Sequence, residues 1–231
     1  MAQTRAYHGF DLAIAKNSSD KVCYILLPEG LKADGLEWME QAAEEFGCNI
    51  IAISGMNWND DLTPWQAKGV FKKEKDFGGK ASFFLKDFMD DCLVNVESSI
   101  GVSRAERTLV GISLSGLFAI WSSTQTDKFR GIASISGSLW YDGFAQRFNM
   151  LKVNPAVRKI FLSLGDKEKN SKDQRMATVE DATSEVVSRL KSQGVPVDYV
   201  KDEGTHFSPI IPRLQAALAS LYTTPTIKQD C

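Results

Sequence analysis

Short runs of branched apolar residues alternate with longer amphipathic stretches along most of this chain. The runs have the length and composition of buried strands, and they cover residues 21–27, 49–54, 107–112, 130–136, 158–164 and 196–201. The longer stretches have helical periodicity and cover residues 36–46, 81–99, 116–125, 173–193 and 209–221. Such alternation predicts an α/β fold with a mostly parallel central sheet and helices on both faces. Residues 6–16 add an expected antiparallel strand at one edge.

The size and charge of the chain indicate one globular domain without a polyanionic partner. The chain has 231 residues, of which 43% are hydrophobic, and a formal net charge of −2 with Lys and Arg scattered along it. We expect a single domain over residues 1–222, a loose tail over 223–231, and no binding to nucleic acid or a membrane. Residues 1–20 lack the apolar centre of a signal peptide, so we also expect a cytoplasmic location.

The four cysteines do not follow a metal-binding or disulfide pattern. Cys23, Cys48, Cys92 and Cys231 are widely spaced, and the first three lie among apolar or helical residues. We therefore expect reduced thiols, no metal site and no cofactor. Nothing in the sequence marks a particular oligomeric state.

Residues 55–79 form a connection that is too long for a simple turn and is rich in aromatic residues. The segment follows the carboxyl end of a predicted strand, where open α/β sheets bind ligands. One interpretation makes it a wall of a substrate pocket, with Trp58 in contact with the substrate. The other makes it a surface loop held in place by its aromatic side chains.

A segment with small residues at alternate positions joins a predicted strand to a predicted helix: Gly111-Ile112-Ser113-Leu114-Ser115. A serine nucleophile at a sharp strand-to-helix turn needs small residues two positions before and after it, which gives the pattern Gly-x-Ser-x-Gly. Here Ser115 replaces the second glycine. Ser115 is a weaker nucleophile candidate, because Leu117 would then occupy a position that requires a small residue. We expect Ser113 to be the nucleophile; the alternative is a serine that only caps the helix.

A serine nucleophile needs an imidazole base, and the chain has two histidines. His206 lies between the last predicted strand and the last predicted helix, which is the place of the base in the order serine, acid, histidine. We expect only a structural role for His8, which precedes the core strands. The acid is expected in the turn after the preceding strand, at Glu168, with Asp166 as the alternate.

Two further carboxylates, Asp202 and Glu203, are closer to His206 in sequence. They end the last predicted strand and are equally compatible with surface charges.

Backbone N–H groups are expected to stabilise the oxyanion that forms on the attacked carbonyl. The N–H of Leu114, directly after the nucleophile, is one expected donor. The second should come from the loop after an early strand, where Gly30 is the first choice and Glu29 and Leu31 are close rivals.

The segment "GISLSGLFAIW" resembles the "GHSxGGLFA" elbow of the putative esterase group within the α/β hydrolases, which includes the esterase D type and siderophore (enterobactin) esterases. The segment "SGSLWYDGF" is similar to their "SPSxWW". The resemblance implies an α/β-hydrolase fold with a small or no lid. It also implies Ser113 as nucleophile, Glu168 as acid, His206 as base and Trp140 near the substrate.

The sequence thus predicts a serine esterase that acts on a small-molecule ester through an acyl-enzyme. Two alternatives stay open: another acyl-transfer enzyme on the same triad, such as a thioesterase, peptidase or acyltransferase, and a non-catalytic binding protein of the same fold.

Overall fold

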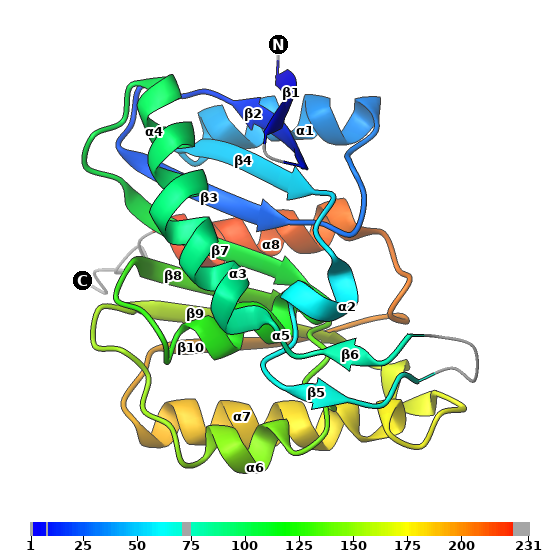
Figure 1. The fold of residues 1–231 in the computed structure, drawn as a ribbon. Coiled ribbons are helices and arrows are strands. Elements are labelled where there is room, and N and C mark those ends of the chain that lie inside the picture. Colours follow the sequence, from blue (N-terminus) through cyan, green and yellow to red (C-terminus); the bar gives the residue numbers. More distant parts are fainter. Residues whose placement is uncertain (1, 8, 71–74, 224–231) are drawn as a thin grey trace, which may run out of the picture.

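The residues described by this computed structural model, 2–7, 9–70 and 75–223, form an eight-stranded sheet with the order β1-β2-β4-β3-β7-β8-β9-β10 (Figure 1). The strands are β1 (Gln3–Tyr7), β2 (Phe10–Ala15), β3 (Lys21–Leu26), β4 (Asn49–Ser54), β7 (Glu106–Ile112), β8 (Phe129–Ile135), β9 (Lys159–Gly165) and β10 (Val197–Asp202). In this order, neighbouring strands from β4 to β10 are paired in parallel, whereas the β1–β2 and β2–β4 pairs are antiparallel. The predicted α/β fold class is confirmed.

The amino-terminal edge has two antiparallel strands where the sequence predicted one. β2 pairs with β4, and β1 pairs with β2 as the outermost strand. β1 is mostly exposed, and its sequence, QTRAY, lacks the branched apolar residues from which the other strands were predicted. His8 lies outside the described residues, as does the predicted tail beyond residue 223.

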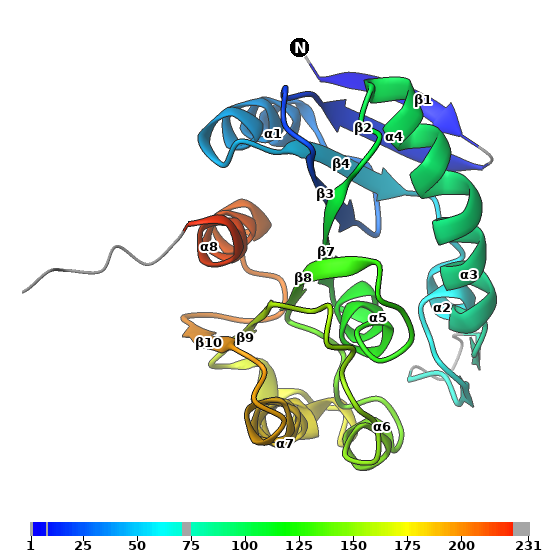
Figure 2. The same ribbon diagram turned by 90° about the vertical axis from the view of Figure 1, so that its left-hand side faces the viewer.

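Helices cover both faces of the sheet (Figure 2). α1 (Ala33–Glu45) and α8 (Ile210–Tyr222) pack on one face with their own cluster of buried residues. The other face carries the larger cluster and the helices α3 (Ala81–Asp87), α4 (Val94–Ile100), α5 (Leu114–Ser122), α6 (Phe144–Phe148) and α7 (Val179–Ser192). Residues 55–79 contain the short helix α2 (Trp58–Asp61) and the strand pair β5 (Gln66–Ala67) and β6 (Phe77–Gly78).

The helix predicted over residues 81–99 contains a π-helical turn, Phe88–Leu93, between α3 and α4. Phe88, Cys92 and Leu93 in this turn are all buried. The wider turn keeps these side chains against the sheet, and tertiary packing thereby overrides the regular helical period.

The parallel strands bring distant parts of the chain to one edge of the sheet. The carboxyl ends of β3, β7, β8, β9 and β10 lie at the same edge, because these strands are paired in parallel. The segments that follow them carry Ser113, Ser136, Glu168 and His206. This edge is where an open α/β sheet forms its site.

Two phenylalanines test how strongly the core depends on α5. We expect Phe118→Ala to lower the free energy of unfolding by about 3–5 kcal/mol, because the side chain is fully buried and its removal leaves a cavity. Phe83→Ala on α3 is the matched control, since Phe83 is 71% exposed. This variant should change the free energy of unfolding by less than about 0.5 kcal/mol. Urea unfolding measures both; equal losses would contradict the expected core.

Candidate active site

Ser113 lies at a sharp turn between β7 and α5. Its backbone has φ 58° and ψ −122°, a conformation that non-glycine residues rarely adopt. A Cβ atom on Gly111 would lie 1.9 Å from the Ser115 carbonyl oxygen, and one on Gly116 would lie 2.8 Å from Gly137 Cα. Only glycine therefore allows the helix to approach the strands this closely, and the turn holds Ser113 in a strained conformation.

Ser115, the departure from the glycine pattern, stabilises this turn. Its side chain is fully buried, and its Oγ donates to the Leu26 carbonyl (2.8 Å) and accepts from the Ile112 N–H (2.7 Å). The hydroxyl thus links the turn to the end of β3. Gly116 supplies the close approach that the second glycine of the pattern would otherwise give.

Ser113, His206 and Glu168 come together at the carboxyl edge of the sheet. Ser113 Oγ lies 3.1 Å from His206 Nε2, and His206 Nδ1 lies 2.9 Å from Glu168 Oε2. With the proton on Nδ1, the imidazole donates to the carboxylate and accepts from the serine hydroxyl. Ser113 Oγ also lies 3.4 Å from Ser138 Oγ.

The Glu168 carboxylate is buried, with 4% of its side chain exposed. Burial raises its pKa, but hydrogen bonds from His206, Ser136 Oγ and the Gly165 N–H (2.8 Å) together outweigh burial and hold the pKa below its ordinary value. The group is therefore a carboxylate near neutral pH.

Asp166 makes a different contact. Its Oδ1 accepts a hydrogen bond from the Gly204 N–H (2.8 Å), and the Lys167 N–H donates to the Gly204 carbonyl (2.9 Å). Asp166 thereby anchors the loop that carries His206, whereas Glu168 binds the imidazole.

Sequence reasoning missed two residues that lie against the Glu168 carboxylate, Ser136 and Arg213. Both are buried, and Ser136 connects the Arg213 guanidinium to the Glu168 carboxylate. Asp202, whose sequence position is equally compatible with a surface charge, pairs with Arg213 (3.0 Å). The available signal was an arginine inside the apolar helix "IIPRLQAALA".

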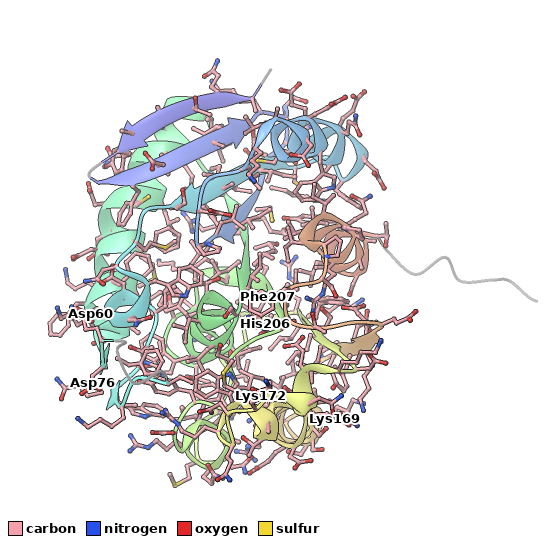
Figure 3. All side chains as sticks on the ribbon, turned by 90° about the vertical axis from the view of Figure 1, so that its right-hand side faces the viewer. Asp60, Asp76, Lys169, Lys172, His206 and Phe207 are labelled. Carbon is pink, nitrogen blue, oxygen red and sulfur yellow. The ribbon has the colours of Figure 1, made fainter. Side chains whose placement is uncertain are left out.

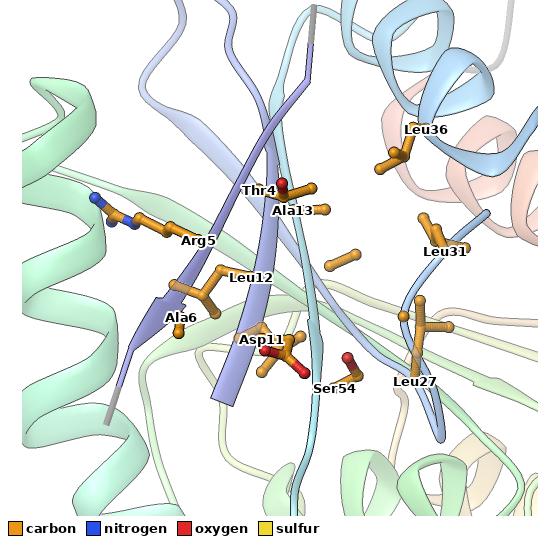
Figure 4. Close-up of a pocket in the computed structure, with 13 residues that line it drawn as sticks. Thr4, Arg5, Ala6, Asp11, Leu12, Ala13, Leu27, Leu31, Leu36 and Ser54 are labelled. Carbon is orange, nitrogen blue, oxygen red and sulfur yellow. The ribbon is translucent and has the colours of Figure 1, made fainter. Parts of the chain in front are cut away.

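The two expected oxyanion donors, Leu114 and Gly30, lie in the segments that follow β7 and β3. Leu114 is the first residue of α5, so its N–H has no acceptor within the helix. Gly30 lies in the loop after β3, whose last residue, Leu26, is bound to Ser115. Gly30 also lies in the wall of a cavity of about 350 Å³ between this loop and the strands β2 and β4 (Figure 4). The donor roles of Leu114 and Gly30 stay predictions.

A second cavity, of about 280 Å³, opens beside the imidazole. Its apolar lining includes Trp140, Met176, Val179 and Phe207, and His206 is part of its wall. Phe207 is 92% exposed and lies next to His206 at the surface, with their rings in edge contact (Figure 3). The described residues that line this cavity do not include Trp58, which packs against the larger core cluster.

The aromatic residues of the 55–79 segment hold it against the segment that carries Trp140. Trp65 stacks on Phe144 and donates from Nε1 to the Asp142 carbonyl (3.0 Å), and the Tyr141 hydroxyl donates to the Trp65 carbonyl. Burial raises the pKa of Tyr141 to about 12, so its phenol stays protonated as a donor. Phe77 contacts Trp140 at 6.4 Å between ring centroids. The segment thus supports the cavity wall through its packing.

Cys23, Cys48 and Cys92 are free and buried. Burial raises the pKa of the Cys48 and Cys92 thiols to about 12, so they stay protonated. In the part of the chain that the structure describes, no three His, Cys, Asp or Glu side chains are placed to share a metal ion. No helix of residues 2–7, 9–70 and 75–223 has the length and apolar character needed to cross a membrane.

The mostly parallel sheet and the strained serine between a strand and a helix define the α/β-hydrolase fold. The chain belongs to the Putative esterase family, whose model matches residues 32–220. This membership confirms the predicted family and supports the predicted class, a serine hydrolase of carboxylic esters.

One curated relative is the uncharacterized protein YbbA of Bacillus subtilis (strain 168), with 30% identity over 152 residues. The match covers 64% of this chain and 61% of YbbA, less than two thirds of its length. Among solved structures, an IroE-like serine hydrolase from Shewanella oneidensis has a TM-score of 0.73 and 18% identity, covering 96% of this chain and 79% of that one. The siderophore hydrolase EstA from Aspergillus nidulans has a TM-score of 0.72 and 21% identity, covering 96% and 93%. These structural similarities show the fold.

The lowered pKa of Glu168 predicts a pH-dependent contribution to stability. A carboxyl group whose pKa is depressed by folding stabilises the protein above its unfolded pKa, which for glutamate is about 4.3, and loses this effect as the pH falls through the folded value. The difference in unfolding free energy between the wild type and Glu168→Gln should therefore be largest near pH 7 and shrink below about pH 4. Urea unfolding from pH 7 to pH 3 measures it; a constant difference would contradict this contribution.

Proposed function

We propose that the protein is a serine esterase in which Ser113 is the nucleophile and His206 is the general base and acid. Glu168 orients the imidazole and stabilises its protonated form. The observation that carries the proposal is the unbroken contact from Ser113 Oγ through the His206 ring to the Glu168 carboxylate, at 3.1 and 2.9 Å. This is the arrangement that makes a serine hydroxyl nucleophilic.

In the acylation half of the reaction, Ser113 Oγ attacks the ester carbonyl carbon while His206 Nε2 takes the hydroxyl proton. The resulting oxyanion is stabilised by the backbone N–H groups of Leu114 and Gly30. The carbon–oxygen bond to the alcohol then breaks, and the imidazolium returns its proton to the leaving alkoxide. In the second half, His206 Nε2 takes a proton from water as the water oxygen attacks the acyl carbon. The bond from this carbon to Ser113 Oγ then breaks, and the imidazolium returns the proton to Oγ, which releases the carboxylic acid and restores Ser113.

The apolar cavity beside His206 supports a small-molecule ester with an apolar or aromatic group as substrate, with Trp140 as a wall of the cavity. Contact of Trp58 with the substrate belongs to the same proposal, on the expectation that the 55–79 segment that contains it forms a wall of the substrate pocket. The mechanism requires no cofactor. A cytoplasmic location is consistent with three free, buried thiols.

A fluorophosphonate probe tests the triad without knowledge of the natural substrate, because it reacts with an activated serine. The wild type should be labelled, Ser113→Ala should not, and His206→Ala and Glu168→Gln should be labelled at least roughly a hundredfold more slowly, since the base or its orienting partner is lost. In-gel fluorescence and mass spectrometry of the labelled peptide measure both rate and site.

Two matched variants are the controls. Asp166→Asn should be labelled within a few-fold of the wild-type rate, because Asp166 accepts from the Gly204 N–H, whereas Glu168 contacts the imidazole. Ser115→Ala should still be labelled at Ser113, because Ser115 is not the attacking group, but more slowly than the wild type, since the turn loses its hydrogen bonds to Leu26 and Ile112. An unlabelled, folded wild type would favour a non-catalytic binding protein, and slow labelling of Asp166→Asn alone would favour Asp166 as the acid.

The exposed ring of Phe207 should contribute to substrate binding. We expect Phe207→Ala to raise the KM for an aromatic 4-nitrophenyl ester such as the benzoate by roughly tenfold, which corresponds to about 1.4 kcal/mol, with little change for 4-nitrophenyl acetate. Phe83→Ala, which removes another exposed phenylalanine away from this cavity, is the control. Equal effects on the two esters would show that Phe207 does not line the binding cavity.

A further inference from the structure

Arg213 is a buried cation beside the Glu168 carboxylate, and the mechanism above gives Arg213 no role. It lies in the first turns of α8, and 5% of its surface is exposed. Its Nη2 donates to Ser136 Oγ and lies 3.6 Å from Glu168 Oε1, and its Nε donates to Asp202 Oδ2 at 3.0 Å. Burying a charged guanidinium costs several kcal/mol of desolvation and is often no gain in stability over apolar packing. These contacts of Arg213 therefore indicate a role other than stabilising the fold.

The Ser136 hydroxyl connects Arg213 to one specific oxygen of Glu168. Ser136 has φ 46°, an uncommon value for serine, and its Oγ accepts from Arg213 Nη2 while donating to Glu168 Oε1. The Gly165 N–H occupies the same oxygen at 2.8 Å. Oε1 is thereby saturated, and Oε2 is left as the oxygen that faces His206.

The net charge of Glu168, Asp202 and Arg213 together is complementary to a protonated His206 imidazole. Glu168 and Asp202 are carboxylates and Arg213 is a cation, so the cluster carries one excess negative charge while the imidazole is neutral. It becomes balanced when His206 takes the proton of Ser113. Asp202 offsets Arg213, so that Arg213 orients Glu168 without cancelling its attraction for the imidazolium.

We propose that Arg213, acting through Ser136 and offset by Asp202, is a positioning residue that fixes the Glu168 carboxylate and sets the pH at which His206 can act as a base. The proposal rests on the proposed function of Ser113, His206 and Glu168. Arg213 touches none of the reacting atoms.

The other charged groups around Glu168 are already engaged or at the surface. Asp166 binds the Gly204 N–H, and Lys169 and Lys201 pair with Glu180. Lys167 is exposed at the cavity beside His206. Among the described residues, Arg213 is thus the cation whose buried guanidinium lies beside Glu168, besides the imidazole of His206. Asp202 is joined to Arg213 rather than to Glu168.

The test is the rate of fluorophosphonate labelling of Ser113 as a function of pH, together with kcat and KM for 4-nitrophenyl acetate. Arg213→Met should lower kcat by roughly ten- to a hundredfold with little change in KM, because the carboxylate loses its fixed orientation. It should also move the acidic limb of the labelling profile to higher pH, since two carboxylates then favour the protonated imidazole. Asp202→Asn should move that limb in the opposite direction, to lower pH.

Further variants separate positioning from folding. Arg213→Lys keeps the charge, so it should restore the position of the acidic limb and part of kcat. Ser136→Ala removes the bridge and should lower kcat. Arg107→Met is the matched control, because Arg107 forms a partly buried ion pair with Glu97 (2.6 Å). Arg107 lies six residues before Ser113, about 20 Å away along β7. This variant should lower the melting temperature and leave the pH profile in place.

Each outcome separates this inference from the proposed function. A wild type that is not labelled at Ser113 overturns the proposed function and, with it, this role of Arg213. A labelled wild type whose Arg213→Lys, Asp202→Asn and Ser136→Ala variants keep the wild-type pH profile and kcat overturns this inference alone. If Arg213→Met does not fold, these three variants still decide the question.

Discussion

The site depends on the sharp turn that places Ser113 between β7 and α5. The turn forces Ser113 to a positive φ and brings the backbone of α5 so close to β7 that Gly111 has no room for a Cβ atom. The buried Ser115 hydroxyl then joins the turn to β3. The strain at the nucleophile is therefore held by backbone packing and one buried side chain, and the large core around α5 supports it.

Parallel pairing makes the rest of the site possible. Because β7, β9 and β10 run in the same direction, the segments after them meet at one edge and bring a serine, a carboxylate and an imidazole within hydrogen-bond distance. The loop that carries His206 is held by the hydrogen bond from the Gly204 N–H to Asp166, and it is followed by α8, which supplies Arg213. The imidazole is thus positioned by neighbours on several strands.

Much of the fold could be predicted because its signals are local. Buried parallel strands are continuous apolar runs, and β4 was predicted with the bounds that the structure has. The exposed strand β1 and the π-helical turn at Phe88–Leu93 were not predicted, since the pairing of the first and the packing of the second are decided by residues far away in the chain. Arg213 escaped prediction for the same reason: its partners lie directly after β8, on β10 and in the turn after β9.

The sequence by itself determined the alternation of strands and helices, the small residues that a strained serine requires, and the order serine, acid, histidine along the chain. These features depend on residue type and spacing, which are local properties. Tertiary structure alone decided that Glu168 rather than Asp166 contacts the imidazole, that the buried Ser115 hydroxyl supports the turn, and that Asp202 pairs with the Arg213 guanidinium. Each of these depends on the distance between side chains brought together by the sheet, and no spacing along the chain encodes that distance.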